Sequence, residues 1–255
     1  MLFCLDIGNT TIVMGLYAGD ELRHHWRIAA DARKMPDEYA VLLWNLCAQG
    51  GVALAEVKGI VMASVVPPLT GVFQEVCQGL FGRPALVVDA GVKTGVRIRY
   101  ENPREVGADR VANAVAAFRL YGGPACVVDF GTATIFDAIS REGDYLGGAI
   151  APGVYASAEA LYRTTAKLPR IDVVRPPSAI GRNTVQSMQS GLLYGSVGLV
   201  EGMVGRYRAE LGEDLHVVAT GGLAPVIAAE TSVIQAVDPW ITLKGLRFIW
   251  ELNQG

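Results

Sequence analysis

Two short segments of this 255-residue chain combine an aspartate, a glycine and hydroxyl residues at the end of an apolar stretch. The first is DIGNTT, beginning at Asp6, and the second is DFGTAT, beginning at Asp129. In a tight turn after a strand, such residues bring backbone N–H groups and threonine hydroxyls together, which suits phosphate oxygens. The aspartate would repel phosphate and is better suited to hold a cation or its waters, as carboxylates do for Mg²⁺. Either segment alone is also typical of an ordinary hairpin turn.

The two segments repeat each other. LDIGNTTIVM, from Leu5 to Met14, aligns without gaps on VDFGTATIFD, from Val128 to Asp137. The matching pairs are Asp6 with Asp129, Gly8 with Gly131, Thr11 with Thr134, and Ile12 with Ile135. Because both follow an apolar strand and lead into another, the sequence predicts a duplicated β-turn-β unit, one in each half. Two such turns facing each other would clamp a polyphosphate.

The segment YENPREVGADR, from Tyr100 to Arg110, is the best candidate for the reacting centre. It precedes an apolar helix expected to begin near Val111, and anions are favoured at a helix N-terminus. Asp109 could accept a proton from a substrate hydroxyl, and Arg110 could pair with a carboxylate or phosphate. The alternative is that Asp109 merely caps the helix.

A third glycine-rich junction, TGG at 220–222, follows the apolar stretch HVVAT and could abut a nucleotide. Glycine in such a loop also has purely conformational uses. Several other site motifs are missing from the sequence: GxxxxGK[ST], a GxGxxG after a strand, HExxH and GxSxG. A P-loop kinase, a dinucleotide dehydrogenase, a zinc protease of that type and an elbow-type serine hydrolase are therefore disfavoured.

The elements that must position these residues alternate between strand-like and helix-like patterns, which predicts an α/β fold that opens with a meander. The strand-like segments are 2–7, 12–17, 21–28, 59–66, 85–90, 126–131, 134–140 and 216–220. The helix-like segments are 36–49, 69–81, 184–210 and 243–253, with a glycine-rich stretch at 143–154. The length predicts two modest cores.

Composition narrows the class of protein further. Apolar residues make up 51% and charged residues 18%, which is typical of a packed globular chain. A formal charge of −3 disfavours nucleic acid as a partner. No apolar run is long enough to cross a membrane and no signal peptide is indicated, so a cytoplasmic protein is expected. The four cysteines are widely spaced and are expected to be reduced core thiols, and the three histidines are expected to be structural.

Seven motifs, in order and over nearly the whole chain, resemble those of the type III pantothenate kinases. They are DIGNT, NPREVGADR, DFGTAT, GGAIAPG, TAKLP, GRNT followed by SMQSG, and TGG. The resemblance implies the duplicated actin-like, ribonuclease H-like ATPase fold, with two mixed-sheet halves and flanking helices. The expected halves are residues 1–117, with the first phosphate turn, and 118–255, with the second turn and an adenosine-side TGG loop.

The resemblance also implies a reaction, namely ATP-dependent phosphorylation of pantothenate to 4′-phosphopantothenate, the first step of coenzyme A biosynthesis. It implies Mg²⁺ with the ATP, a monovalent cation (K⁺ or NH₄⁺) at Asp129, Asp109 as general base, and a homodimer. The implied ATP-binding residues are Asp6, Ile7, Gly8, Asn9, Thr10, Thr11, Ile12, Val13 and Thr132. The implied substrate-binding residues are Tyr100, Gly107, Ala108, Asp109, Arg110 and Thr184.

Two other functions stay open at this point. One is a different kinase or phosphatase on the same scaffold, acting on a sugar, acetate or polyphosphate, because fold alone does not set the substrate. The other is a nucleotide-binding regulator without catalysis, against which the intact Asp6, Asp109 and Asp129 speak.

Overall fold

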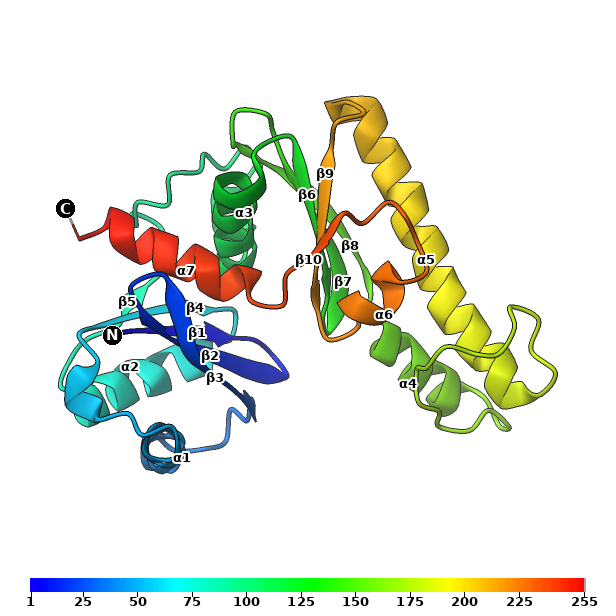
Figure 1. Cartoon of the computed structure of the whole chain (residues 1–255). Coiled ribbons are helices and arrows are strands. Elements are labelled where there is room, and N and C mark those ends of the chain that lie inside the picture. Colours follow the sequence, from blue (N-terminus) through cyan, green and yellow to red (C-terminus); the bar gives the residue numbers. More distant parts are fainter. Residues whose placement is uncertain (255) are drawn as a thin grey trace. The chain divides into compact units, whose positions relative to one another are not determined.

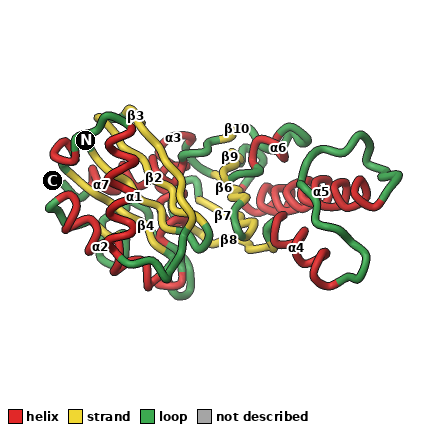
Figure 2. The backbone as a smooth tube through the Cα atoms, turned by 90° about the horizontal axis from the view of Figure 1, so that it is seen from below, coloured by secondary structure: helices red, strands yellow, loops and turns green. Residues whose placement is uncertain are grey.

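The computed structural model describes residues 1–254 and divides into two units (Figure 1), and Figure 2 distinguishes its helices, strands and loops by colour. Unit 1 contains Met1–Val96, Glu101–Ala116 and the segment from Thr242 onward, and unit 2 contains Arg97–Tyr100 and Ala117–Ile241. The C-terminal helix therefore packs with the N-terminal half. The division of the duplicated halves near residue 117 stays a prediction.

Unit 1 is built on a five-stranded sheet with the order β3-β2-β1-β4-β5. Strands β1, β2 and β3 form an antiparallel meander, whereas β4 and β5 run parallel to β1. Its strands are β1 (Leu2–Ile7), β2 (Thr11–Ala18), β3 (Glu21–Ala29), β4 (Gly59–Ser64) and β5 (Leu86–Val87). Its helices are α1 (Pro36–Gln49), α2 (Pro67–Phe81), most of α3 (Ala108–Tyr121) and α7 (Ile241–Leu252), with 3₁₀ turns at Leu54–Glu56 and Pro103–Glu105.

Helices cover both faces of this sheet. Helices α1 and α2 pack on one face, where buried residues of β1, β2 and β4 join buried residues of both helices in one apolar cluster (Figure 1). Helix α7 covers the other face, because a side chain at Gly15 of β2 would meet Leu243 and one at Gly59 of β4 would meet Trp250. Helix α1 begins at a proline, and the Glu38 carboxylate accepts the Met35 N–H at 2.8 Å, which satisfies a free donor at the helix start.

Unit 2 repeats this arrangement with the sheet order β10-β9-β6-β7-β8. Strand β6 pairs antiparallel with β7 and parallel with β9, as β1 pairs with β2 and β4. The predicted duplication and the two mixed sheets are therefore confirmed. The strands are β6 (Ala125–Phe130), β7 (Ala133–Ile139), β8 (Tyr145–Pro152), β9 (His216–Gly221) and β10 (Ala236–Val237), and the helices are α4 (Val154–Thr164), α5 (Thr184–Leu211) and α6 (Ala224–Ala228).

The gapless alignment of the two phosphate turns is wrong beyond the turn itself. The residue pair that flanks the turn is Ile7 with Ile12 in unit 1 and Phe130 with Thr134 in unit 2. The second turn is therefore one residue shorter, and Thr134 takes the place of Ile12 rather than that of Thr11. Because side chains alternate between sheet faces, the shift explains why Thr134 is buried and Thr11 is exposed.

Other differences from the sequence prediction are local. The glycine-rich stretch near 143–154 contains the strand β8, and helix α3 begins at Ala108 rather than near Val111. All four cysteines are free and buried, as predicted, and burial raises the pKa of the Cys77 thiol to about 12. Within residues 1–254, no helix has the length and apolar character needed to span a bilayer.

Candidate functional site

The first phosphate turn joins β1 to β2 in unit 1. The Gly8 N–H donates to the Thr11 carbonyl at 3.1 Å, which closes the turn, and Asn9, Thr10 and Thr11 lie exposed at its tip. The Thr10 carbonyl accepts the Ala30 N–H at 3.0 Å from the loop after β3. The exposed tip thus offers backbone and hydroxyl donors on a fixed frame, as the phosphate-binding prediction requires.

The flanks of this turn differ in exposure. Ile7 and Ile12 are fully buried in the apolar core and anchor the two strands, whereas Asp6 and Val13 are half-buried on the opposite face. Asp6 therefore stands at the strand end, on the opposite side from the core, where a cation could be held.

Asp109 lies at the same end of the sheet as this turn. A side chain on Gly107 would collide with Asp109 Oδ1 and press against the Val65 side chain, so Asp109 and Val65 both lie next to Gly107. Val65 follows β4, and its N–H donates to the carbonyl of Ile7 at 3.1 Å. Since β4 runs parallel to β1, the loop that carries Asp109 and the end of β1 come together within unit 1.

The environment of Asp109 favours the protonated carboxyl. Burial is the largest influence and raises the pKa of Asp109, while the Arg110 N–H, 2.8 Å from Oδ1, and the Arg110 guanidinium act to lower it. A raised pKa makes this carboxylate a stronger base than an exposed aspartate. Asp109 is the second residue of α3, so it accepts an N–H inside the first turn instead of capping the helix from outside.

Three motifs of unit 2 meet around the second turn. The Gly131 N–H donates to the Ala133 carbonyl at 3.0 Å, and Thr132 is exposed at the tip. A side chain on Gly153, at the end of the GGAIAPG motif, would collide with the carbonyls of Gly131 and Thr132. These two motifs therefore touch through their backbones.

The TGG loop reaches the same place. Gly221 has a φ of +88°, and a Cβ there would lie 2.5 Å from the Phe130 carbonyl and 2.8 Å from Asp129 Oδ1. The half-buried Asp129 carboxylate therefore lies against the TGG loop. The TGG loop that contains Gly221 was predicted to lie on the adenosine side, whereas Gly153 was not predicted as a site residue, although it ends the GGAIAPG motif.

The predicted substrate residues Tyr100 and Thr184, both in unit 2, are not brought together. The Tyr100 ring lies beside Gly147 of β8, and β8 borders a shallow pocket of about 200 Å³ that includes Tyr207 and Leu211 near the C-terminal end of α5. Thr184 is the first residue of α5, next to its cap Asn183. At 1.5 Å per residue, Thr184 and Tyr207 are separated by roughly 35 Å along the helix.

Two mixed sheets of identical strand order, each with a glycine-rich turn between its first two strands, define the actin-like fold of sugar kinases and ATPases. Solved structures share this fold at low identity. A Thermus thermophilus ROK hexokinase aligns with a TM-score of 0.51 and 15% identity over 99% of each chain. A Campylobacter jejuni protein assigned to the Baf family of transcriptional activators aligns with a TM-score of 0.63 and 17% identity over 98% of each chain.

The sequence comparisons are more specific. The family model for type III pantothenate kinase matches residues 2–206. A type III pantothenate kinase from Moorella thermoacetica is 55% identical over 99% of this chain and 100% of its own length, and one from Roseiflexus sp. is 52% identical over 100% of both. The chain belongs to the type III pantothenate kinase family.

Proposed function

We propose that this chain transfers the γ-phosphoryl group of ATP to the primary hydroxyl of pantothenate, giving 4′-phosphopantothenate and ADP, the first step towards coenzyme A. The observation that carries this function is the half-buried Asp109 carboxylate, with its raised pKa, at the same end of the sheet as the first phosphate turn. Family membership and full-length identity above 50% to named pantothenate kinases supply the substrate.

Each part of the site has a separate role in the reaction. Asp109 takes the proton of the attacking hydroxyl, and Arg110 beside it pairs with an anionic group of the substrate. The N–H groups and hydroxyls of the two turns bind the nucleotide phosphates, and Mg²⁺ bound with ATP neutralises charge on them. Phosphoryl transfer depends mainly on such positioning and electrostatics, which these groups are suited to supply.

We also propose that Asp129 holds the monovalent cation. Its carboxylate lies against Gly221, and the carbonyls of Gly131 and Thr132 crowd the neighbouring Gly153, so oxygen atoms dominate this part of unit 2. Hard cations prefer such oxygen ligands. Replacing K⁺ by Na⁺ in the assay should lower turnover of the wild type, and turnover that is indifferent to the cation would contradict this role.

The exposed face of α5 supports a homodimer. Gly191, Gly195, Gly198, Gly202 and Gly205 recur at alternating spacings of four and three, so they lie on one side of the helix. Among residues 1–254, a Cβ at four of these glycines would have no neighbour within 4 Å, and at Gly202 the neighbour is the Arg206 side chain of the same helix. Glycine inside a helix costs about 1 kcal/mol relative to alanine. A second copy packed closely against this face would offset that cost.

A second copy would also resolve the placement of Thr184. Because Thr184 and Tyr100 mark opposite ends of α5 in one chain, Thr184 would reach the pantothenate site of the partner chain.

The four cysteines are free and buried, which is consistent with a protein that functions in the reducing cytoplasm.

The function is tested by ADP release from purified protein with Mg-ATP and K⁺, comparing pantothenate with glucose, acetate and no acceptor. Release that depends on pantothenate supports the proposal. Release that depends on glucose or acetate identifies a different kinase on this scaffold. Intact ATP binding without turnover on any acceptor identifies a nucleotide-binding regulator.

A further inference from the structure

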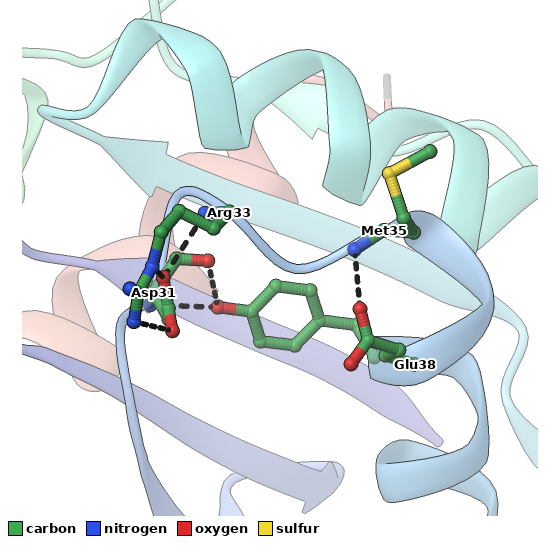
Figure 3. Close-up of polar contacts among 5 residues, drawn as sticks. Asp31, Arg33, Met35 and Glu38 are labelled. Carbon is green, nitrogen blue, oxygen red and sulfur yellow. Dashed lines mark hydrogen bonds and ion pairs between the residues drawn. The ribbon is translucent and has the colours of Figure 1, made fainter.

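The loop between β3 and α1 is bonded to the first phosphate turn on one side and to the core of unit 1 on the other. Figure 3 shows the polar contacts around Asp31 in this loop. On the turn side, the Ala30 N–H donates to the Thr10 carbonyl at 3.0 Å. On the core side, the Asp31 N–H donates to the Tyr39 hydroxyl at 2.9 Å, and that hydroxyl donates to the Asp31 carbonyl at 3.0 Å. One phenol oxygen thus bridges both backbone polar groups of the residue next to Ala30.

Tyr39 is itself held firmly. It lies on α1 with 0% of its surface exposed, and its ring packs against the Phe73 ring of α2 with the centroids 4.8 Å apart. A buried phenol normally has a hydrogen-bond partner, and here both of its bonds go to Asp31. The loop is therefore fixed to a rigid part of the core.

The Asp31 side chain stabilises the loop separately. Its carboxylate accepts the Arg33 N–H at 3.0 Å and the Arg33 Nε and Nη2 donors at 2.9 Å each, as Figure 3 shows. Arg33 is 89% exposed, so this pair is open to solvent and contributes little to stability. The Ala30 side chain packs against the apolar core, and the hydrogen bonds that join Asp31 to the core run through the Tyr39 hydroxyl.

We propose that Tyr39 is a positioning residue that holds the phosphate turn in its ATP-binding conformation through Asp31, Ala30 and Thr10. The inference rests on the proposed function, because the turn is taken to bind the phosphates of ATP. Tyr39 does not touch the nucleotide. It acts by fixing the frame from which the turn presents its donors.

Loss of the hydroxyl should weaken ATP binding and little else. In Tyr39→Phe the ring still fills the core, but the Asp31 N–H loses its partner and the Asp31 carbonyl keeps only the Lys34 N–H, at 3.2 Å, so the Ala30–Thr10 contact is less firmly anchored. Each hydrogen bond of this kind changes an equilibrium by about fivefold. Since the Asp109 carboxylate accepts the Arg110 N–H within α3 rather than a donor of this loop, proton abstraction should be unaffected.

The test is the dissociation constant of Mg-ATP, measured by calorimetry without pantothenate, together with the steady-state constants of Tyr39→Phe. We expect the dissociation constant and the KM for ATP to rise about fivefold or more. The KM for pantothenate and the kcat at saturating ATP should stay within twofold of the wild type. ATP binding unchanged within twofold would overturn the inference.

Phe73→Leu is the matched control, because it loosens the packing of the same ring and leaves the hydroxyl in place. It should lower the melting temperature without changing ATP affinity, and weaker ATP binding in Phe73→Leu equal to that in Tyr39→Phe would also overturn the inference. If Tyr39→Phe does not fold, Ala30→Pro decides the question, because proline removes the N–H that bonds Thr10. Ala30→Pro must then weaken Mg-ATP binding, and wild-type affinity would refute the link. Wild type that binds Mg-ATP but leaves pantothenate unphosphorylated would contradict the proposed function alone.

Discussion

Asp109→Asn separates catalysis from stability. Removing a general base costs about 10²- to 10⁴-fold in rate, so kcat should fall by that factor while the affinity for Mg-ATP is kept. The substitution is nearly isosteric, and the amide oxygen can still accept the Arg110 N–H that now lies 2.8 Å from Oδ1. The carboxylate's basicity is therefore the main property that changes.

The stability of the same variant follows from the direction of the pKa shift. Burial raises the pKa of Asp109, so the folded chain binds a proton there more tightly than the unfolded chain does. The stability that this protonation supplies is fully present below the unfolded pKa and is lost as the pH rises through the folded pKa. Above the folded pKa the wild type carries a half-buried charge at this position, and there Asp109→Asn should melt at the same temperature or higher.

Two assays on one preparation check this reasoning. Pantothenate-dependent ADP release gives kcat, and thermal unfolding followed at several pH values gives stability. The pH profile of kcat/KM should also fall on its acid side at a higher pH than an exposed aspartate would give, because the base must be ionised. Wild-type turnover in Asp109→Asn, or a marked loss of melting temperature at neutral pH, would refute this account of Asp109.

The remaining predictions concern unit 2. Gly221→Ala forces a side chain into a backbone with φ +88° and against the Phe130 carbonyl and Asp129. The left-handed conformation alone should lower the free energy of unfolding, measured by urea denaturation, by about 1–2 kcal/mol. Activation of turnover by K⁺ should also be lost. A Cβ at Gly198 would have no neighbour within 4 Å among residues 1–254, so Gly198→Leu should give a folded monomer in light scattering, whereas an intact dimer would exclude this face of α5 as the interface. Gly79→Leu on the open face of α2 is its control and should leave the oligomer unchanged.

The fold was predictable because it depends on patterns that the sequence carries twice. The turns DIGNTT and DFGTAT, each between two apolar stretches, identified the duplicated β-turn-β unit, and both sheets confirm it. The one-residue difference between the turns was hidden, because Thr11 and Thr134 align by type even though only Thr134 is buried. Which threonine faces the core is decided by the pairing register, which a gapless alignment does not contain.

The site was predictable only in part. Asp109 was identified from the polar groups gathered before an apolar helix, but the nearby Val65 is brought to the end of β1 by the parallel pairing of β4 with β1. The contact of Gly153 with the second turn likewise joins distant segments. The Tyr39 hydroxyl had no sequence signal, because a tyrosine on an amphipathic helix is typical of core packing whether or not its oxygen has a function.

The most direct test of the central claim is the identity of the product. Wild-type protein incubated with Mg-ATP, K⁺ and pantothenate should give, in ³¹P-detected NMR, a phosphomonoester coupled to the methylene protons of the 4′ carbon, and Asp109→Asn should give almost none. ADP formed without phosphorylated pantothenate, or phosphate attached at another position, would contradict the account.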